Sequence, residues 1–366
     1  MSEQIKCIGC GVPIQTEDKE GLGYAPPSSL KKEAVICQRC FRLKHYNEIQ
    51  DVNLTDDDYR KILSSIGDTQ SLVVKIVDIF DFNGSWLPGI HRYIGKNKLM
   101  LVGNKVDLLP KSVNKNRLKQ WMATMAKEYG VKAEEVHLVS SAKGTGLQEV
   151  AEQIDELREG KDVYVVGCTN VGKSTFINGL IKQLGTEQQD IITTSYFPGT
   201  TLNLIDIPLD EETALFDTPG IINHHQMAHF VSKDELKIIM PKKEIKPLVY
   251  QLNEEQSLFL GGLARFDYIK GGRRSFVCHI SNDLNIHRTK LERADDLYEK
   301  HLGELLTPPQ DREKLPPLKR YEFMIKEKDT DIVFSGLGWI SVKEAGAKVA
   351  AYAPEGVAVT LRPSLI

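Results

Sequence analysis

The segment that most constrains the fold of this chain is a glycine-rich octapeptide between an apolar run and an amphipathic one. It reads G-C-T-N-V-G-K-S from Gly167 to Ser174. Glycines let such a loop curl so that backbone N–H groups face phosphate, and the start of the next helix adds partial positive charge. The context predicts a strand over residues 162–166, a phosphate-binding loop and a helix. A chance glycine-rich turn is the alternative, and the flanking strand and helix disfavour it.

Individual residues of this loop have separate predicted roles. Lys173 is predicted to reach the β and γ oxygens of a bound nucleotide, and Ser174 to ligate Mg²⁺. Cys168 is predicted to be a small buried residue and not a catalytic thiol. The predicted nucleotide-binding residues of this segment are Gly167, Cys168, Thr169, Asn170, Val171, Gly172, Lys173, Ser174 and Thr175.

A second motif, D-T-P-G, begins at Asp217, 44 residues after Lys173 and at the end of an apolar run. In that position a carboxylate can join the Mg²⁺ shell, and the N–H of Gly220 can meet the γ-phosphate. Alone, the tetrapeptide is an ordinary turn. Behind a phosphate-binding loop it predicts a segment that senses whether the γ-phosphate is present.

A third motif, N-K-V-D, contains Asn104, Lys105 and Asp107 and follows the apolar run of residues 98–103. The Asp107 carboxylate can accept from both N1–H and N2–H₂ of guanine, a pairing that adenine does not offer, so adenine would leave a buried charge unpaired. The nucleotide is therefore predicted to be GTP or its product GDP. After the next apolar run, the small residues of Ser141-Ala142-Lys143 can bring a backbone N–H to guanine O6, although this signal is weak by itself.

These motifs resemble those of the GTPase superfamily in an unusual order, since the guanine-reading motifs precede the phosphate loop. The chain resembles a circularly permuted GTPase with the order G4-G5-G1-G2-G3. Chain termini often lie close together in a compact domain, so such a cut can preserve the site. The predicted class is an α/β domain with a mostly parallel sheet. Strands are predicted at residues 72–80, 98–103, 136–139, 162–166, 202–207 and 213–216, and helices at 116–129 and 147–157.

The GTPase resemblance implies further roles in catalysis. Pro198-Gly199-Thr200-Thr201 fits switch I, with one threonine hydroxyl on Mg²⁺; Thr201 is favoured and Thr200 stays open. Ile221 stands where many signalling GTPases carry a water-orienting glutamine, which implies slow unaided hydrolysis. Asn170 resembles the asparagine of potassium-dependent GTPases, in which K⁺ supplies charge that an arginine finger would otherwise bring. An asparagine that merely caps the loop is the alternative. Lys173, Asn170 and Thr201 are the predicted catalytic residues.

Four of the six cysteines form two C-x-x-C pairs, namely Cys7/Cys10 and Cys37/Cys40. Two such knuckles supply the four thiolates of a tetrahedral, structural Zn²⁺ site, and a redox dithiol pair is the competing interpretation. Basic and aromatic residues beside the second knuckle suit RNA, or else form a solvated face beside the metal. These residues are Arg39, Phe41, Arg42, Lys44, His45 and Tyr46.

The region after residue 224 is predicted to be a separate α+β domain with a helical stretch, a basic middle section, a Pro-rich linker at residues 307–318 and a strand-rich tail. The basic section suggests an RNA-tracking surface, with a solvated surface as the alternative. Its basic residues are Arg265, Lys270, Arg273, Arg274, Arg288, Lys290 and Arg293, interleaved with Phe266, Tyr268, Phe276 and His287. Cys278 is predicted to be a small buried residue, and His224 and His225 to be exposed switch residues.

The order of zinc knuckles (residues 1–48), permuted GTPase (49–223) and C-terminal domain (224–366) closely resembles the YqeH family of bacterial ribosome-assembly GTPases. The resemblance implies a GTP-driven switch in small (30S) ribosomal subunit assembly, with the flanking domains contacting RNA, protein or a peptide. A net charge of −3 and the lack of an 18-residue apolar run predict a cytoplasmic protein without a membrane partner. A nucleotide-binding scaffold with negligible catalysis is the rival hypothesis. No pattern for haem or flavin chemistry was found.

Overall fold

The computed structural model describes residues 5–8, 12–19, 21, 23–31, 35–38, 40–42, 56–184, 193–196, 203–218 and 220–366. The chain divides into two compact units. The first contains residues 1–79, 85–106 and 115–222, and the second contains residues 80–84, 107–114 and 223–366. The predicted domain boundaries, after residues 48 and 223, remain predictions. Among the described helices, none has the length and hydropathy needed to cross a bilayer.

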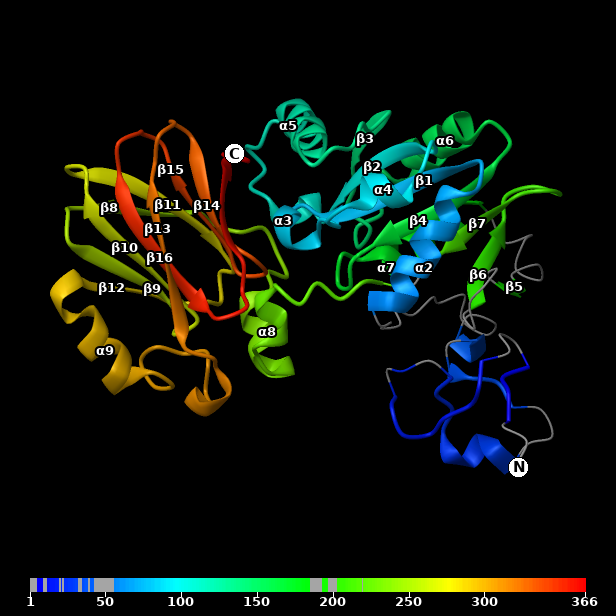
Figure 1. The fold of residues 1–366 in the computed structure, drawn as a ribbon, viewed down its shortest axis with the longest axis horizontal. Helices are drawn as coiled ribbons and strands as arrows, with labels where there is room; N and C mark the ends of the chain where they lie inside the picture. Colours follow the sequence, from blue (N-terminus) through cyan, green and yellow to red (C-terminus); the bar gives the residue numbers. More distant parts are fainter. Residues whose placement is uncertain are drawn as a thin grey trace. The chain divides into compact units, whose positions relative to one another are not determined.

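A seven-stranded sheet forms the centre of the first unit (Figure 1). Five of its strands run parallel, and the last two are antiparallel to their neighbours. Its order is β3 (Glu135–Leu138), β2 (Lys98–Asn104), β1 (Ser71–Asp78), β4 (Asp162–Gly167), β7 (Ala214–Asp217), β6 (Asn203–Pro208) and β5 (Thr193–Tyr196). Residues of β1 are buried along its whole length, as expected for a central parallel strand covered on both faces. The mostly parallel α/β sheet predicted from the sequence is thus present.

The helices of the first unit are α2 (Asp56–Gly67), which precedes β1, and α4 (Ile90–Tyr93), α5 (Lys115–Glu128), α6 (Leu147–Arg158) and α7 (Lys173–Leu184), which lie between strands, with a 3₁₀ turn at Pro27–Lys31. Most of α3 (Phe82–Ser85) and of the 3₁₀ turn Val106–Leu108 belongs to the second unit. The predicted apolar face of α5 contains Leu118, Trp121, Met122 and Met125; all are buried except Trp121, which is half-buried. Helix α6 begins after Gly146, whose φ of 77° lies in the left-handed region that glycine adopts without strain.

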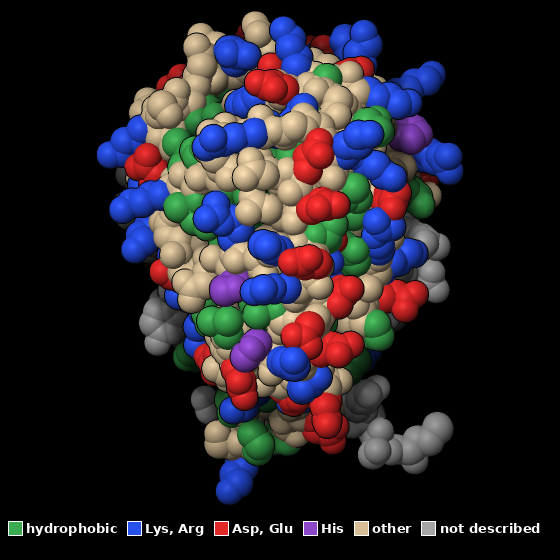
Figure 2. Space-filling model, turned by 90° about the vertical axis from the view of Figure 1, so that its left-hand side faces the viewer, with side chains coloured by type: hydrophobic (Ala, Val, Ile, Leu, Met, Phe, Trp, Pro, Cys, Tyr) green, Lys and Arg blue, Asp and Glu red, His purple; other side chains and the backbone are tan. Residues whose placement is uncertain are grey.

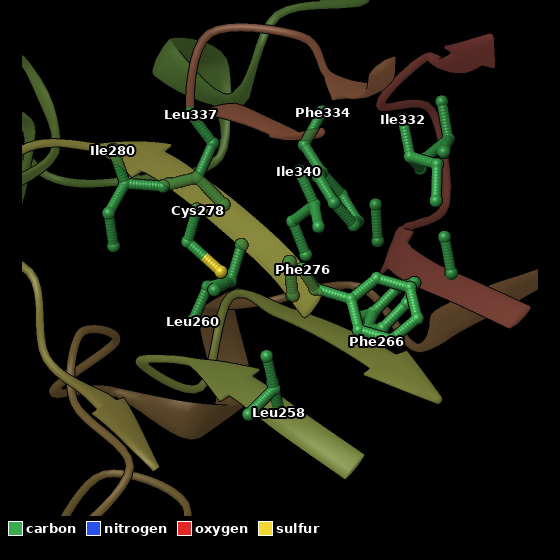
Figure 3. Close-up of a cluster of buried hydrophobic side chains, with 14 of the residues drawn as sticks. Leu258, Leu260, Phe266, Phe276, Cys278, Ile280, Ile332, Phe334, Leu337 and Ile340 are labelled. Atoms are coloured by element: carbon green, nitrogen blue, oxygen red, sulfur yellow. The ribbon is translucent and has the colours of Figure 1, made fainter. Parts of the chain in front are cut away.

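Two five-stranded antiparallel sheets form the second unit. One has the order β12 (Ile286–Lys290), β9 (Gln256–Leu260), β10 (Ala264–Lys270), β16 (Lys348–Pro354) and β13 (Leu318–Met324). The other has the order β17 (Val359–Pro363), β14 (Thr330–Phe334), β15 (Gly338–Val342), β11 (Arg274–Ile280) and β8 (Leu248–Leu252). Helices α8 (Lys233–Ile239) and α9 (Ala294–His301), with 3₁₀ turns at Met227–His229, Leu291–Arg293 and Arg312–Lys314, complete the unit. Side chains from both sheets meet in one apolar core (Figure 3).

The basic middle section of this unit was expected to form a surface. Instead, it consists of strands whose aromatic side chains lie in the core. Phe266, Tyr268 and Phe276 are each 0% exposed, and their rings pack against one another. The segment expected to be a linker is packed within the unit: Pro308 and Pro309 are buried, and the Pro308 carbonyl accepts from the Gly262 N–H at 2.8 Å.

The second unit also contains two short segments from the amino-terminal half of the sequence. In the segment 80–84, the Phe80 ring lies 5.6 Å from that of Trp339, and the Asn83 side chain accepts from Arg362 at 2.8 Å. In the segment 107–114, the Leu108 carbonyl accepts from the Ile245 N–H at 2.8 Å. Both segments directly follow strands of the large sheet, β1 and β2.

Candidate nucleotide site

The glycine-rich loop has the strand–loop–helix context that the sequence predicts. Strand β4 is buried and ends at Gly167, and α7 starts at Lys173. Between them, Asn170 and Gly172 have φ values of 63° and 84°, so the backbone makes the left-handed bends that such a loop requires. A Cβ on Gly172 would lie 2.5 Å from Nδ2 of Asn104, so only glycine fits there. The loop therefore has the left-handed bends and the close approach at Gly172 that suit an anion-binding loop.

Asn104 connects the two guanine-reading motifs to the phosphate loop. Its side chain is 1% exposed, and its Nδ2 donates to the Val171 carbonyl at 2.8 Å. Its Oδ1 accepts from the N–H of Ser141 at 3.0 Å and from the Ser141 hydroxyl at 2.9 Å. Three motifs separated by up to 67 residues thus meet at one buried amide.

Lys105 makes a second connection between the guanine-reading motif and the phosphate loop. Its Nζ donates to Asp78 at 2.7 Å and to the Asn170 carbonyl at 2.5 Å. Asp78 is the last residue of β1, so the carboxyl ends of β1, β2 and β4 are joined through one ammonium group. The carboxyl edge of a parallel sheet is the usual place for a nucleotide site.

The loop lysine and the D-T-P-G aspartate form a buried ion pair. Both side chains are 1% exposed, and Lys173 Nζ donates to Asp217 Oδ1. Neighbouring Ser174 is 8% exposed. A hydroxyl and a carboxylate are hard oxygen ligands of the type that Mg²⁺ prefers, so these two residues fit the predicted metal. A bound phosphate would compete with Asp217 for the lysine.

The D-T-P-G segment lies directly against the phosphate loop. Ile221 forms a parallel bridge with Cys168, and its carbonyl accepts from the Thr169 N–H at 2.7 Å. A Cβ on Gly220 would lie 3.2 Å from the Thr169 methyl carbon, which leaves little room for a larger residue. The predicted γ-phosphate sensor is therefore in contact with the loop that would hold the phosphates.

One charged residue next to this loop was not predicted. Lys75, in the middle of β1, is 0% exposed and donates to the carbonyls of Ser85 at 3.1 Å and Ile76 at 3.2 Å. Burial lowers the pKa of Lys75 to about 8. The buried Cys168 thiol donates to the same Ser85 carbonyl at 3.3 Å. A lysine within an otherwise apolar run was the available sequence signal.

The remaining predicted nucleotide residues are placed as follows. Ala142 and Lys143 are exposed in the turn after β3, Thr175 is exposed on α7, and Asn170 is exposed at the loop tip. Asp107 is half-buried and belongs to the second unit. The switch I residues Thr200 and Thr201 lie outside the described residues, as do Pro198 and Gly199.

Three of the four predicted zinc ligands converge. Cys7, Cys37 and Cys40 are buried, and their sulfurs all lie within 4.8 Å of one another. The Cys37 N–H donates to the Cys7 sulfur at 3.2 Å, a contact that favours a thiolate. A set of converging buried sulfurs fits zinc. Cys10 lies outside the described residues, together with the basic and aromatic positions Arg39, Lys44, His45 and Tyr46.

The predicted RNA-tracking set in the second unit is only partly exposed. Arg265 is 5% exposed and paired with Asp267 at 2.7 Å, and Arg274 donates to the Ala345 carbonyl at 2.9 Å. With Phe266, Tyr268 and Phe276 in the core, stacking of RNA bases on these rings is excluded. The cations that remain exposed are Lys270, Arg273, Arg288, Lys290 and Arg293, and His287 is half-buried. Figure 2, which views the molecule from the left-hand side of Figure 1, shows Lys and Arg side chains interspersed with Asp and Glu.

The predicted burial is confirmed for one cysteine and the predicted exposure for two histidines, namely Cys278, His224 and His225. Cys278 is 0% exposed, and burial raises the pKa of its thiol to about 12, so it is an unreactive core residue. His224 and His225 are exposed.

The motif order and the contacts of Asn104, Lys105 and Lys173 define a circularly permuted GTPase domain. A family model described as "50S ribosome-binding GTPase" matches residues 162–258, and one described as "YqeH-like, C-terminal" matches residues 273–365. The chain is 64% identical, over its full length and that of the relative, to "Uncharacterized protein YqeH" of Bacillus subtilis (strain 168). The chain therefore belongs to the YqeH family.

More distant similarities were also found. A protein of Oryza sativa subsp. japonica named "Putative nitric oxide synthase" is 33% identical, with 93% of this chain and 70% of the relative covered. A crystal structure of GNP-bound YlqF from T. maritima has a TM-score of 0.30 and 20% identity, covering 51% of this chain and 67% of that one.

Proposed function

We propose that the chain is a GTP-hydrolysing switch that acts in assembly of the small ribosomal subunit. The observation that carries the nucleotide part is the Asn104 side chain, which joins both guanine-reading motifs to the phosphate loop. In this proposal Asp107 selects guanine, and Lys173 stabilises the negative charge that spreads over the phosphates during hydrolysis. Ser174, Asp217 and Thr201 hold Mg²⁺, which neutralises the same charge.

Slow intrinsic hydrolysis follows from Ile221, because its apolar side chain offers no group to orient the attacking water. Asn170 supplies a side-chain oxygen at the tip of the loop, where it is exposed. We assign it to a K⁺ that adds positive charge beside the phosphates. A protein general base is not required if positioning and electrostatics supply the rate.

The zinc module and the second unit are proposed as contact surfaces. Zn²⁺ bound by Cys7, Cys10, Cys37 and Cys40 holds the module in shape and takes no part in hydrolysis. In the second unit, the exposed cations Lys270, Arg273, Arg288, Lys290 and Arg293 remain available for phosphates of ribosomal RNA or for a protein. The place of action is the cytoplasm.

Turnover of GTP by the full chain tests this proposal. We expect stimulation in KCl over NaCl at equal ionic strength, and further stimulation by 30S but not 50S subunits. Because the matched GTPase model is described by 50S binding, both subunits belong in the assay. Asn170→Gly retains the left-handed backbone and removes the side-chain oxygen, so it should lose the K⁺ response and keep GDP binding. Indifference to K⁺ and to both subunits would favour the scaffold hypothesis.

A further inference from the structure

A buried lysine lies behind the phosphate loop, in the middle of β1. That strand pairs in parallel with β4, which leads into the loop (Figure 1). Lys75 is 0% exposed, and its partners on the two neighbouring strands are apolar, namely Leu101 and Val166. The thiol of Cys168, which is 1% exposed, lies close enough to interact with its charge. A charged ammonium group in such surroundings is costly unless it is compensated.

Lys75 and the phosphate loop share one hydrogen-bond acceptor. Lys75 Nζ donates to the Ser85 carbonyl at 3.1 Å, and the thiol of Cys168, the second residue of the loop, donates to the same oxygen at 3.3 Å. The Ser85 hydroxyl accepts from the N–H of Asp78 at 3.0 Å and donates to the Asp78 carbonyl at 3.3 Å. Ser85 therefore joins the carboxyl end of β1 to the start of the phosphate loop, and Lys75 holds its carbonyl in place.

Lys75 lacks the carboxylate partner that two other lysines near the phosphate loop have. Lys105 pairs with Asp78 at 2.7 Å, and Lys173 pairs with Asp217. Within the described residues, Lys75 donates to backbone carbonyls alone. Among these five charged groups, one positive charge is therefore left without a balancing carboxylate. The phosphates of a bound nucleotide are the negative charge that can balance it.

Burial sets the pH range in which Lys75 changes its charge. It lowers the pKa of this lysine to about 8, because the ammonium group loses the solvation that water provides. On β4, burial raises the pKa of Tyr164 to about 12, so its hydroxyl is neutral in that range. Helix α6 packs against β1 with the buried residues Leu147, Val150 and Ile154, and its acidic residues are exposed. Neither Tyr164 nor the buried face of α6 therefore brings charge to Lys75 near that pKa.

We propose that Lys75 is a positioning residue of the nucleotide site, which fixes the start of the phosphate loop through Ser85 and takes the bound phosphates as its counter-charge. This role rests on the nucleotide binding proposed for the same site. A charged donor holds a carbonyl about twice as strongly as a neutral donor does. Loss of the ammonium charge loosens the Ser85 carbonyl and removes the attraction to phosphate. Nucleotide affinity therefore falls as the pH rises through about 8.

Proton uptake on GDP binding tests this role. Bound phosphates raise the pKa of Lys75, and a rise of about one unit corresponds to about tenfold in GDP affinity. Calorimetric titration of the nucleotide-free, zinc-loaded full chain with GDP and Mg²⁺, in buffers of different ionisation enthalpy, counts the protons. At about pH 8.5 the wild type should take up about half a proton more than Lys75→Met. At about pH 7, Lys75→Met should bind GDP about tenfold more weakly. The titration of the nucleotide itself is common to both proteins.

Lys98→Met is the matched control. Lys98 begins the neighbouring strand β2, at the opposite end of the sheet, and its side chain is 40% exposed and paired with Glu159. This variant should match the wild type in proton uptake and in affinity. Cys168→Ala removes the nearby thiol and should keep the proton uptake. Lys75→Arg stays charged, so it should take up no extra proton and should bind GDP more tightly than Lys75→Met at about pH 7.

Thermal unfolding shows that each variant is folded. Proton uptake by Lys75→Met or Lys75→Arg equal to that of the wild type overturns the proposal, whatever the affinity of the variant, because a merely structural lysine would leave the uptake unchanged. A wild type that binds no GDP would instead contradict the proposed function itself.

Discussion

Replacing Asn104 by alanine removes three buried hydrogen bonds: one of 2.8 Å to the Val171 carbonyl and two, of 2.9 and 3.0 Å, from Ser141. A typical bond of this kind contributes about 1 kcal/mol, so the free energy of unfolding should fall by about 3 kcal/mol. The loss has a second effect, because the freed groups belong to the two loops that are proposed to hold the phosphates and the base. In the variant, nucleotide binding must also order these loops, which makes the binding free energy less favourable.

We expect this ordering cost to be about 1.4–2.8 kcal/mol, which corresponds to about ten- to hundredfold weaker GDP binding. Asn97→Ala is the matched control. Asn97 also bridges two segments, donating to the Ile66 carbonyl at 2.7 Å and accepting from the Ser71 N–H at 2.9 Å, but it does so at the amino ends of the strands. That variant should lose about 2 kcal/mol of stability and bind GDP normally.

The assay combines urea unfolding with titration of a fluorescent GDP analogue, at a temperature at which both variants are folded. If Asn104→Ala were destabilised but bound GDP as tightly as Asn97→Ala, the argument that this amide preorganises the site would be refuted.

Three further predictions rest on single residues. The pKa of Lys75 is about 8 in the folded chain and 10.5 in the unfolded chain, so the unfolded state binds more protons between these two pH values. The free energy of unfolding should therefore rise with pH across this range, by up to about 3 kcal/mol. Urea unfolding of Lys75→Met should lack that rise. Purified chain should contain one zinc per molecule by metal analysis, and Cys37→Ser should contain none and lose only the folding of its own module. Arg265→Ala strands the buried Asp267 carboxylate and should cost about 3–5 kcal/mol in thermal or urea unfolding, whereas Arg273→Ala, on an exposed residue, should change stability by less than about 0.5 kcal/mol.

The nucleotide-binding unit could be predicted well because its signals are local. β1 and β4 are buried on both faces and read as continuous apolar runs, and α5 and α6 have a clear helical period. Lys75 was missed because its two partners are backbone carbonyls, which leave no mark on side-chain patterns. Switch I stays a prediction, since Thr201 lies outside the described residues.

The second unit was harder to predict because buried charged residues obscure the alternation of apolar and polar residues in its strands. In β10 the buried positions include Arg265 and Asp267, which satisfy one another, so a strand of the core looks charged. Pairing also joins distant segments: β10 lies beside β16, and Phe266 has Ala351 as its partner. The pattern of residues within one short segment cannot show which distant strand pairs with it. For this reason the interleaved cations and aromatic rings of the segment predict a surface, although the rings lie in the core.

The segments 80–84 and 107–114 impose an order on the biosynthesis of this chain. Asn83 receives its hydrogen bond from Arg362, 279 residues later, and Leu108 receives its own from Ile245. A ribosome releases the amino-terminal residues first, so the segment 107–114 waits for residue 245 and the segment 80–84 waits for residue 362. Asp107, the proposed guanine-selecting residue, belongs to the later unit. A chain that ends before residue 245 lacks both hydrogen-bond partners, so neither segment can make its contact within the second unit.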